Sequence, residues 1–389
     1  MDKFIYLDNH ATTKIDERVL ELMMPFLKDN YGNPSNRDSR FGRIAFEAVE
    51  IARQKVAKLI NAQIEEIIFT SCATESNNLV LKGFAENNFK KGKHIVTVAT
   101  EHSSILEVCK KLESFGFEIT ILNVDKFGRI SIEELVSSLR KDTILVSVMM
   151  ANNEIGTIHP IKKIAKICRD KNIAFHTDAS QCGAYLEINS KIIDATFITL
   201  SSHKMYGPKG VGALFVNKNH SPKINSQIDG GGQENKMRSG TLNVPAIVGF
   251  GKACEIAINE QQSDFERISN LRNQMQNELL KLGEITINGE IENRLPNNLN
   301  ISIEGIQNTT LLKNVKNLVF STNSACLSTD ISMGKFSHIL RAIGLNETEA
   351  KSTIRFGLGR FTTKEEIFEA IEILKTEINN IRKNNLVIN

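Results

Sequence analysis

Short apolar runs alternate with longer segments of helical periodicity along the middle of this chain. The runs contain many β-branched and aromatic residues, and polar or turn-forming residues bound them. They occupy residues 66–70, 94–99, 144–150, 174–177, 197–201 and 211–216. Because their apolar content is near-continuous, both faces of each predicted strand should be buried. The pattern between residues 40 and 255 predicts an α/β fold with a mostly parallel sheet covered by helices.

Two segments carry clear helical stripes. One stripe has three- and four-residue spacing and consists of Ala45, Val49, Ala52, Val56 and Leu59. This spacing predicts a helix with one buried face. Near the C-terminus, Thr363 and Glu366 have the spacing of a capping box. They precede a second stripe formed by Ile367, Ile371, Leu374, Ile378 and Ile381. That stripe predicts a long amphipathic helix that packs on its own domain.

The length of 389 residues is enough for two or three domains. The sequence changes character near residue 262, where a long helical pattern is followed by turns rich in Asn and Glu. We therefore expect a large domain over residues 14–261. We expect a smaller α+β domain to be formed by residues 1–13 together with residues 262–389.

The balance of charges and the cysteine usage limit the function classes. With 48 Lys and Arg against 45 Asp and Glu, the net charge is +3, which gives no reason to expect nucleic acid or a membrane surface as the main partner. No stretch approaches the roughly 20 apolar residues of a membrane helix, and the apolar run at the start is too short for a signal peptide. The six cysteines are scattered without a CxxC pair. We therefore expect a cytoplasmic protein without a structural metal site.

Polar residues gather where several predicted strands end. The segments 70–78, 176–181 and 201–210 each include or follow a strand end, and ligands of doubly wound sheets bind outside the carboxyl ends of the strands. Taken alone, each segment has an ordinary explanation: helix capping for the first, capping or a turn at Asp178 for the second, and a solvated Lys204 for the third. A Gly-rich segment at 230–241 lacks the spacing of a nucleotide-binding fingerprint.

Taken together, these segments supply an anion cup, a carboxylate and an amine. The small residues and hydroxyls of 70–78 precede a predicted helix start, where backbone N–H groups are free to bind an anion. Pyridoxal 5′-phosphate needs a phosphate site, a carboxylate at its ring nitrogen and an amine that forms a Schiff base. Asp178 and Lys204 are candidates for the last two. The combination indicates an enzyme that uses this cofactor.

Motifs along nearly the whole chain resemble those of cysteine desulfurases. They include YLDNHATT at 6–13, YGNP at 31–34, ATESNN at 73–78, EH at 101–102, NNEIG at 152–156, SHKMYGPKG at 202–210, RSGT at 238–241, SAC at 324–326 and IRFGLGRFT at 354–362. The chain looks like the iron–sulfur-cluster and nitrogen-fixation type within the class V aminotransferases. The resemblance implies a fold-type I pyridoxal-phosphate transferase that converts L-cysteine to L-alanine and leaves the sulfur as an enzyme persulfide.

The resemblance also implies roles in the cofactor site. Lys204 would form the Schiff base and move the proton on the substrate Cα, while Asp178 would pair with the ring nitrogen. Gln181 would bond the ring hydroxyl oxygen, and His102 would stack on the ring and shuttle a proton. The phosphate would be held by Thr74, Ser201, His203 and the backbone of Ala73.

Further roles concern the substrate, the sulfur and a second subunit. Arg355 would clamp the substrate carboxylate, a task suited to a planar bidentate donor. Asn153, also counted with the cofactor site, and Asn33 would complete that pocket. Cys326 would carry the persulfide. Thr241 would reach the phosphate of the neighbouring subunit, which implies an obligate homodimer.

Some features depart from the family pattern and leave alternatives open. Cys72 and Cys182 lie near presumed cofactor residues and could be mistaken for the nucleophile, but we expect Cys326, and neither of these two, to carry the sulfur. The stretch 327–337 is longer than expected, and the chain ends soon after its last helix. The sulfur acceptor is open among an iron–sulfur scaffold, a transfer-RNA thiolation protein and DNA-sulfur-modification proteins. Rival functions are a related lyase or transaminase for another amino acid, such as selenocysteine, and a non-catalytic sulfur-relay protein. Arg360 is expected to be structural.

Overall fold

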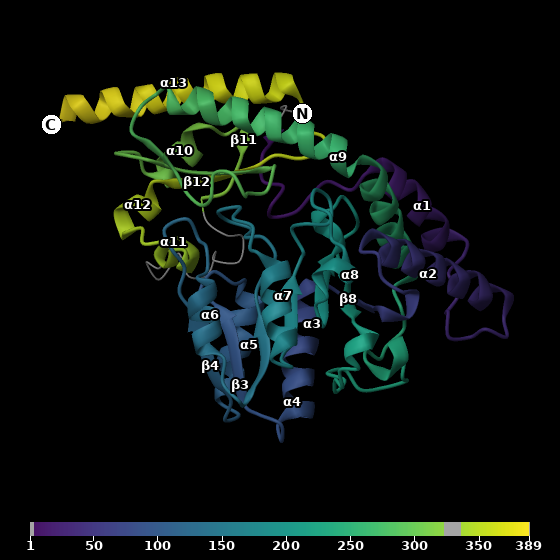
Figure 1. The fold of residues 1–389 in the computed structure, drawn as a ribbon. Coiled ribbons are helices and arrows are strands. Elements are labelled where there is room, and N and C mark those ends of the chain that lie inside the picture. The colour runs from purple at the N-terminus through teal and green to yellow at the C-terminus, as the bar shows by residue number, and fades with distance from the viewer. Residues whose placement is uncertain (1–3, 323–335, 389) are drawn as a thin grey trace.

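The computed structural model describes residues 4–322 and 336–388 (Figure 1). Its main element is a seven-stranded sheet with the order β2-β8-β7-β6-β5-β3-β4. These strands are β2 (Ile67–Thr70), β3 (His94–Val98), β4 (Glu118–Leu122), β5 (Thr143–Ser147), β6 (Ala174–Asp178), β7 (Phe197–Ser201) and β8 (Gly212–Val216). Strands β4, β3, β5, β6 and β7 pair in parallel, whereas β8 is antiparallel to both of its neighbours. The predicted mostly parallel sheet is confirmed.

The helices vary from one turn to ten turns. They are α1 (Glu17–Lys28), α2 (Arg40–Leu59), α3 (Ala73–Asn78), α4 (Ala85–Asn88), α5 (Ser103–Glu113), α6 (Ile132–Ser138), α7 (Ile161–Asp170), α8 (Ser190–Ile193), α9 (Val244–Leu280), α10 (Asn308–Asn314), α11 (His338–Ala342), α12 (Glu347–Lys351) and α13 (Lys364–Ile388). Short 3₁₀ turns lie at Ile64–Glu66, Ser202–Lys204, Lys218–His220 and Glu234–Lys236, and a π-helical turn at Leu79–Phe84 joins α3 to α4. Within the described residues, no helix is long and apolar enough to cross a membrane.

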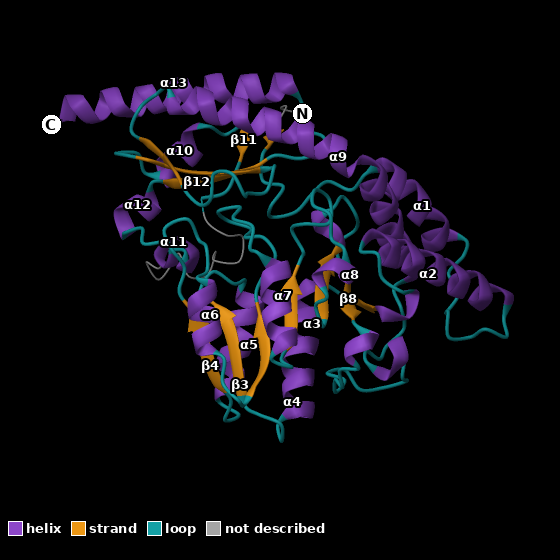
Figure 2. Ribbon diagram, viewed as in Figure 1, coloured by secondary structure: helices purple, strands orange, loops and turns teal. Residues whose placement is uncertain are grey.

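Helices cover both faces of the large sheet (Figure 2). On β3, Ile95 belongs to a hydrophobic cluster with residues of α5 and the π-helical turn, whereas the next residue, Val96, belongs to a second cluster that includes residues of α7. Strands β3 and β5 are buried at every position, so their apolar runs do not alternate. Strand β4 escapes this signal because it is the edge strand and exposes part of its length.

A smaller unit lies beyond the carboxyl ends of the parallel strands (Figure 1). It contains the antiparallel sheet β12 (Thr353–Gly357), β10 (Asn298–Ile303) and β9 (Ile285–Ile287). The N-terminal strand β1 (Ile5–Tyr6) pairs in parallel with β11 (Leu318–Val319), so the N-terminus joins this unit. The 37-residue helix α9 runs without interruption across residue 261. The two units therefore share one helix at the predicted boundary, and the division at 261 stays a prediction.

The long C-terminal helix begins as its sequence predicts. The Thr363 hydroxyl accepts a hydrogen bond from the Glu366 backbone N–H at 3.1 Å, and the Glu366 carboxylate accepts one from the Thr363 N–H at 3.0 Å. This reciprocal pair is a capping box. The predicted stripe, including Ile367 and Ile378, is buried, and α13 contacts α9 and α10 of its own unit.

Candidate active site

A cavity of about 220 Å³ lies where the large sheet meets the smaller unit, at the carboxyl ends of β6 and β7. It brings together most of the predicted site residues: Ala73, Thr74, His102, Asn153, Asp178, Gln181, Ser201, His203, Lys204 and Arg355. These residues come from six separate segments of the chain. Successive parallel strands open at the same edge of a sheet, which is why their distant loops converge here.

Asp178 is the last residue of β6 and its carboxylate is held from two sides. One oxygen accepts a hydrogen bond from the side-chain amide of Asn77 at 2.8 Å, and the other accepts from the backbone N–H of Ser180 at 2.9 Å. Nearby, burial and the charge of Asp178 raise the pKa of Glu101 well above its usual value. Burial thus opposes a second negative charge beside Asp178.

Lys204 lies one short turn beyond β7. Its ammonium donates to the backbone carbonyls of His10 and Ala11, the second at 2.7 Å. The same His10 carbonyl accepts from the side-chain amide of Gln181 at 3.2 Å. The N-terminal segment therefore holds the two groups that the resemblance assigns to the cofactor ring.

The predicted phosphate end of the cavity is formed by the start of α3 and the end of β7. Ser201 Oγ is buried and has no hydrogen-bond partner among the described residues. Burial and the charges of Lys204 and Lys209 lower the pKa of His203 to about 4, so its ring is neutral at pH 7. It exchanges a hydrogen bond with Thr12 Oγ1 at 3.1 Å.

Arg355 reaches the cavity from β12 of the smaller unit, and its side chain is only 2% exposed. The guanidinium donates to the Asp8 carboxylate at 2.8 Å and to the backbone carbonyl of Asn153 at 3.1 Å. Two fixed acceptors hold the planar group in one orientation. His102 is the N-cap of α5, where its Nδ1 accepts from the Ser104 N–H at 3.1 Å.

Two predicted residues do not line this cavity, and a third is not among the described residues. Asn33 lies in the exposed loop after α1, where its side chain accepts from the Ser35 N–H at 2.9 Å. Thr241 is exposed in the loop before α9. Cys326 lies outside the described residues. Within one chain, therefore, the structure brings neither Asn33 nor Thr241 to the site, and their roles stay predictions.

The competing cysteines differ in their surroundings. Cys182 is fully buried, and burial raises the pKa of its thiol far above the usual value. Cys72 is partly exposed and lines the cavity. Of these two cysteines, Cys72 is the one that can meet a substrate in this cavity.

Three residues that position the site were missing from the predicted set. Asn77 holds Asp178, Asp8 holds Arg355, and His10 Nδ1 exchanges a hydrogen bond with Gln181 Oε1 at 3.0 Å. All three lie within the matched motifs at 6–13 and 73–78. The motifs could have suggested them as a group, but the sequence does not say which partner each one meets.

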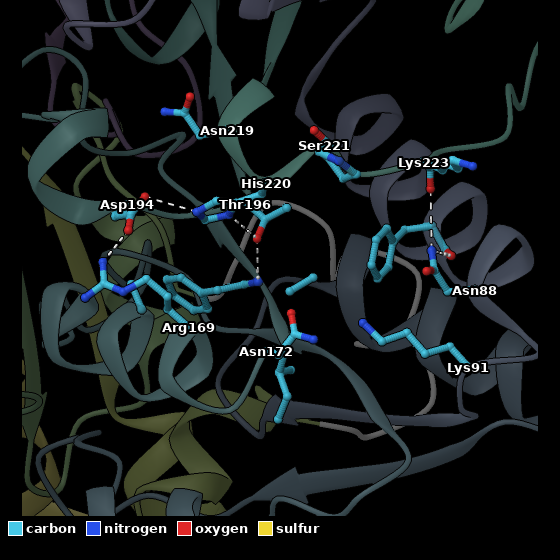
Figure 3. Close-up of a pocket in the computed structure, with 16 residues that line it drawn as sticks. Asn88, Lys91, Arg169, Asn172, Asp194, Thr196, Asn219, His220, Ser221 and Lys223 are labelled. Carbon is cyan, nitrogen blue, oxygen red and sulfur yellow. Dashed lines mark hydrogen bonds and ion pairs between the residues drawn. The ribbon is translucent and has the colours of Figure 1, made fainter.

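A second polar pocket, of about 470 Å³, lies at the opposite end of β6 (Figure 3). Its central side chains bond to one another: His220 exchanges hydrogen bonds with Asp194 at 3.1 Å and with Thr196 at 3.0 Å, and Asp194 also pairs with Arg169. No predicted site residue lines this pocket, which we call the outer pocket.

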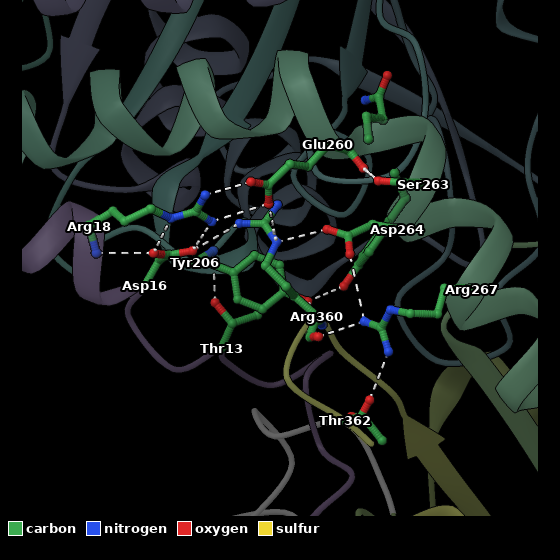
Figure 4. A network of polar contacts seen from close by, with 12 residues as sticks. Thr13, Asp16, Arg18, Tyr206, Glu260, Ser263, Asp264, Arg267, Arg360 and Thr362 are labelled. Carbon is green, nitrogen blue, oxygen red and sulfur yellow. Dashed lines mark hydrogen bonds and ion pairs between the residues drawn. The ribbon is translucent and has the colours of Figure 1, made fainter. Parts of the chain in front are cut away.

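A network of ion pairs surrounds Arg360 (Figure 4). Its guanidinium pairs with Asp264 of α9 at 2.7 Å and with Asp16, the N-cap of α1, at 3.3 Å. The same group lies over the ring of Tyr206. Arg360 thus joins the two units outside the cavity, as expected of a structural residue.

Known proteins match this chain over nearly its whole length. The aminotransferase class-V family matches residues 5–369. Cysteine desulfurase IscS of Buchnera aphidicola subsp. Baizongia pistaciae (strain Bp) is 47% identical over 380 residues, 97% of this chain and 93% of that protein. A solved NifS-like protein shares 36% identity with a TM-score of 0.90, covering 97% of this chain and 99% of its own. A structure described as SspA in complex with cysteine shares 34% identity with a TM-score of 0.81, covering 92% and 99%.

These matches define first a class and then a narrower group. The chain belongs to the aminotransferase class-V family of pyridoxal-phosphate enzymes and, within it, to the cysteine desulfurases. The predicted fold-type I architecture is confirmed by the NifS-like structure.

The cavity residues fit the cofactor of this family. Ser201 Oγ at the phosphate end and Ser180 Oγ beside Asp178 are buried without partners among the described residues, and an unpaired buried hydroxyl is costly unless a ligand bonds to it. The ring end offers the Asp178 carboxylate and the Lys204 amine. An acid, an amine and free hydroxyls are the donor set that pyridoxal 5′-phosphate requires.

Proposed function

We propose that this chain takes sulfur from L-cysteine, releases L-alanine and holds the sulfur as a persulfide on Cys326. The observation that carries the proposal is the convergence of the Lys204 amine, the Asp178 carboxylate and the Arg355 guanidinium on one cavity. Bound there, pyridoxal 5′-phosphate withdraws electrons from the substrate Cα. Asp178 and Gln181 would hold its ring. Its phosphate would be held by Ala73, Thr74, Ser201 and His203, with Asn153 nearby.

Proton movement falls to Lys204 and His102. The carbonyls of His10 and Ala11 accept hydrogen bonds from the Lys204 ammonium, which holds this amine at the cavity, where it would carry the Cα proton. His102 Nδ1 is occupied by Ser104. We assign the proton exchange with the substrate to Nε2 of His102.

Arg355 would hold the substrate by its carboxylate. Asp8 and the Asn153 carbonyl fix two guanidinium nitrogens, while Nε is buried without a partner among the described residues. A guanidinium that is oriented before the substrate arrives binds a carboxylate with little ordering cost. The Asn153 side-chain oxygen also lacks a partner in the described part of the chain, which fits its proposed place in this pocket.

In the sulfur step, the Cys326 thiolate would attack the sulfur of the substrate, and the substrate carbon that loses the sulfur would take up a proton. A new S–S bond joins the substrate sulfur to Cys326, the substrate C–S bond breaks, and the carbon skeleton leaves as alanine. Support for Cys326 is its SAC motif. The complete burial of Cys182 argues against this residue, because a buried thiol cannot pass sulfur to an acceptor protein.

The test is a single-turnover reaction of the cofactor-loaded protein with L-cysteine and no keto acid. We expect alanine and persulfide in equal amounts, with the extra sulfur on the Cys326 peptide by mass spectrometry. Cys326→Ala should form no alanine, whereas the matched variants Cys72→Ala and Cys182→Ala should form it at the normal rate. A keto-acid requirement would indicate a transaminase, and sulfur on Cys72 with an active Cys326→Ala variant would show the wrong nucleophile.

The proposal includes a homodimer and a protein acceptor of the sulfur. Exposed apolar side chains on α1, α2 and their connecting loop fit a dimer surface: Leu20, Leu27, Tyr31, Phe41 and Ile51. In that dimer Thr241 would complete the neighbouring phosphate site and Asn33 the substrate pocket. The acceptor we propose is an iron–sulfur scaffold in the cytoplasm, and the alternatives are a transfer-RNA thiolation protein and a DNA-sulfur-modification protein. Capture by the persulfidated protein distinguishes them.

A further inference from the structure

His10 is a buried histidine that contacts two groups of the candidate cofactor site. Its ring exchanges a hydrogen bond with Gln181, and its backbone carbonyl accepts from both Gln181 and Lys204. The ring is 1% exposed. Burial and the charges of Arg355, Lys204 and Arg294 lower the pKa of His10 to about 3, so the imidazole is neutral and carries one N–H.

Which nitrogen carries that hydrogen is set by residues behind the ring. Arg294 donates to Asn298 Oδ1 at 2.7 Å, and a guanidinium can only donate. The oxygen of the Asn298 amide therefore faces Arg294. The side-chain nitrogen of Asn298 donates to the Glu154 carbonyl at 3.1 Å and lies 3.2 Å from His10 Nε2. Because the Asn298 nitrogen is a donor, His10 Nε2 must accept and Nδ1 must carry the hydrogen.

The same reasoning orients Gln181. The Nδ1–H of His10 requires an acceptor, which is Gln181 Oε1 at 3.0 Å. Gln181 Nε2 then donates to the His10 carbonyl at 3.2 Å, which can only accept. Two independent contacts thus give one amide orientation. Gln181 lines the cavity, so its second N–H is the group that it can offer to an acceptor bound there.

We infer that Arg294, Asn298 and His10 form a relay that fixes Gln181 as a hydrogen-bond donor to an anionic ring oxygen of the cofactor. This inference deepens the proposed function and rests on it. His10 is a positioning residue, since it acts through Gln181. A flipped Gln181 would present its carbonyl oxygen to that anion and destabilise it.

Asn298→Asp reverses the relay with almost no change of shape. The new carboxylate pairs with Arg294, which has no carboxylate partner among the described residues. It offers His10 Nε2 an acceptor in place of a donor, so the hydrogen moves to Nε2. Gln181 must then turn its N–H toward His10 Nδ1 and its oxygen toward the cavity.

Asn300→Asp is the matched control. Asn300 lies two residues along the same strand, and its amide also donates to the Glu154 carbonyl, at 3.0 Å. Within the described residues, its side chain makes no hydrogen bond to His10. The control therefore adds the same negative charge and disturbs the same carbonyl without reversing the relay.

The first measurement uses the protein without cofactor. Nitrogen-15 NMR of labelled histidines, assigned with a His10→Gln variant, should show the Nδ1–H tautomer at His10 in the wild type and in Asn300→Asp. It should show Nε2–H or a protonated ring in Asn298→Asp. An Nε2–H tautomer in the wild type overturns the inference even if Asn298→Asp fails to fold.

The second measurement uses the loaded protein. A lost charge-assisted hydrogen bond should raise the ratio of protonated to deprotonated chromophore at fixed pH about tenfold in Asn298→Asp, with little change in Asn300→Asp. Equal changes in both variants contradict the relay. A chain that binds no pyridoxal phosphate contradicts the proposed function instead, and the tautomer result stands apart from that outcome.

Discussion

The cavity and the outer pocket lie at opposite ends of β6, and polar side chains line both. The two sets of side chains differ in their hydrogen bonding. In the outer pocket, the ring of His220 forms hydrogen bonds with the side chains of Asp194 and Thr196. In the cavity, the hydroxyls of Ser180 and Ser201 are buried without partners in the described part of the chain. A buried hydroxyl without a hydrogen-bond partner destabilises the folded protein unless a ligand bonds to it. The outer pocket is the larger of the two. The unpaired buried hydroxyls, and not the volume, therefore favour the cavity as the binding site.

The largest expected effect follows from removing the cavity's amine. Lys204→Ala should lower alanine formation from cysteine at least about 1,000-fold, because it removes both the group that holds the cofactor and a general base. The variant should stay folded, as circular dichroism would show. Substantial turnover by this variant would refute the assignment of Lys204.

The next effect concerns the substrate clamp. Arg355→Lys replaces a planar fork by a point charge, and one charge-assisted hydrogen bond contributes about 1.5–3 kcal/mol. We therefore expect kcat/KM for cysteine to fall about 10- to 100-fold, with cofactor affinity unchanged. Loss of cofactor with normal kcat/KM would place Arg355 in the cofactor site instead.

His159 is a third case to compare with the cavity and the outer pocket, because its buried side chain lines neither of them. Neither of its ring nitrogens has a hydrogen-bond partner among the described residues, and burial lowers its pKa from 6.5 to about 4. The unfolded chain therefore takes up the proton first as the pH falls. The stability contribution is complete above pH 6.5 and is lost on acidification toward pH 4.

His159→Leu should remove this pH dependence. The decrease in unfolding free energy between pH 7 and pH 5 should become smaller by about 2 kcal/mol, measured by urea denaturation at both values. Equal decreases in wild type and variant would show that His159 is not held neutral in the folded state. An unpaired polar atom marks a binding site only where a cavity adjoins it.

The smallest effect on activity is expected in the outer pocket. His220→Ala leaves Thr196 and Asp194 with one partner fewer, so stability should fall by about 1 kcal/mol. The kcat/KM for cysteine should stay within about twofold of the wild type, because the change lies at the far end of β6. A large loss of activity in a stable variant would mean that the two ends of this strand are coupled.

The sequence predicts the fold better than the contacts of the site. The apolar runs of β3 and β5 reveal a sheet buried on both faces, while the half-exposed edge strand β4 lacks that signal. The resemblance identified the cavity residues in six segments. It did not show that His10 meets Gln181 or that Asp8 meets Arg355, because such pairs depend on how distant segments pack. Asn33 and Thr241 illustrate the opposite limit, since neither lines the cavity of one chain and their roles stay predictions.

The central claim is that the cavity around Lys204, and not the outer pocket, binds pyridoxal 5′-phosphate. Borohydride treatment of the loaded protein fixes the cofactor on the amine that holds it, and peptide mapping then identifies that amine. The account predicts the label on the Lys204 peptide in the wild type and its absence in Lys204→Ala. A label on Lys91 or Lys223 of the outer pocket, or no label on any lysine of the loaded wild type, would contradict it.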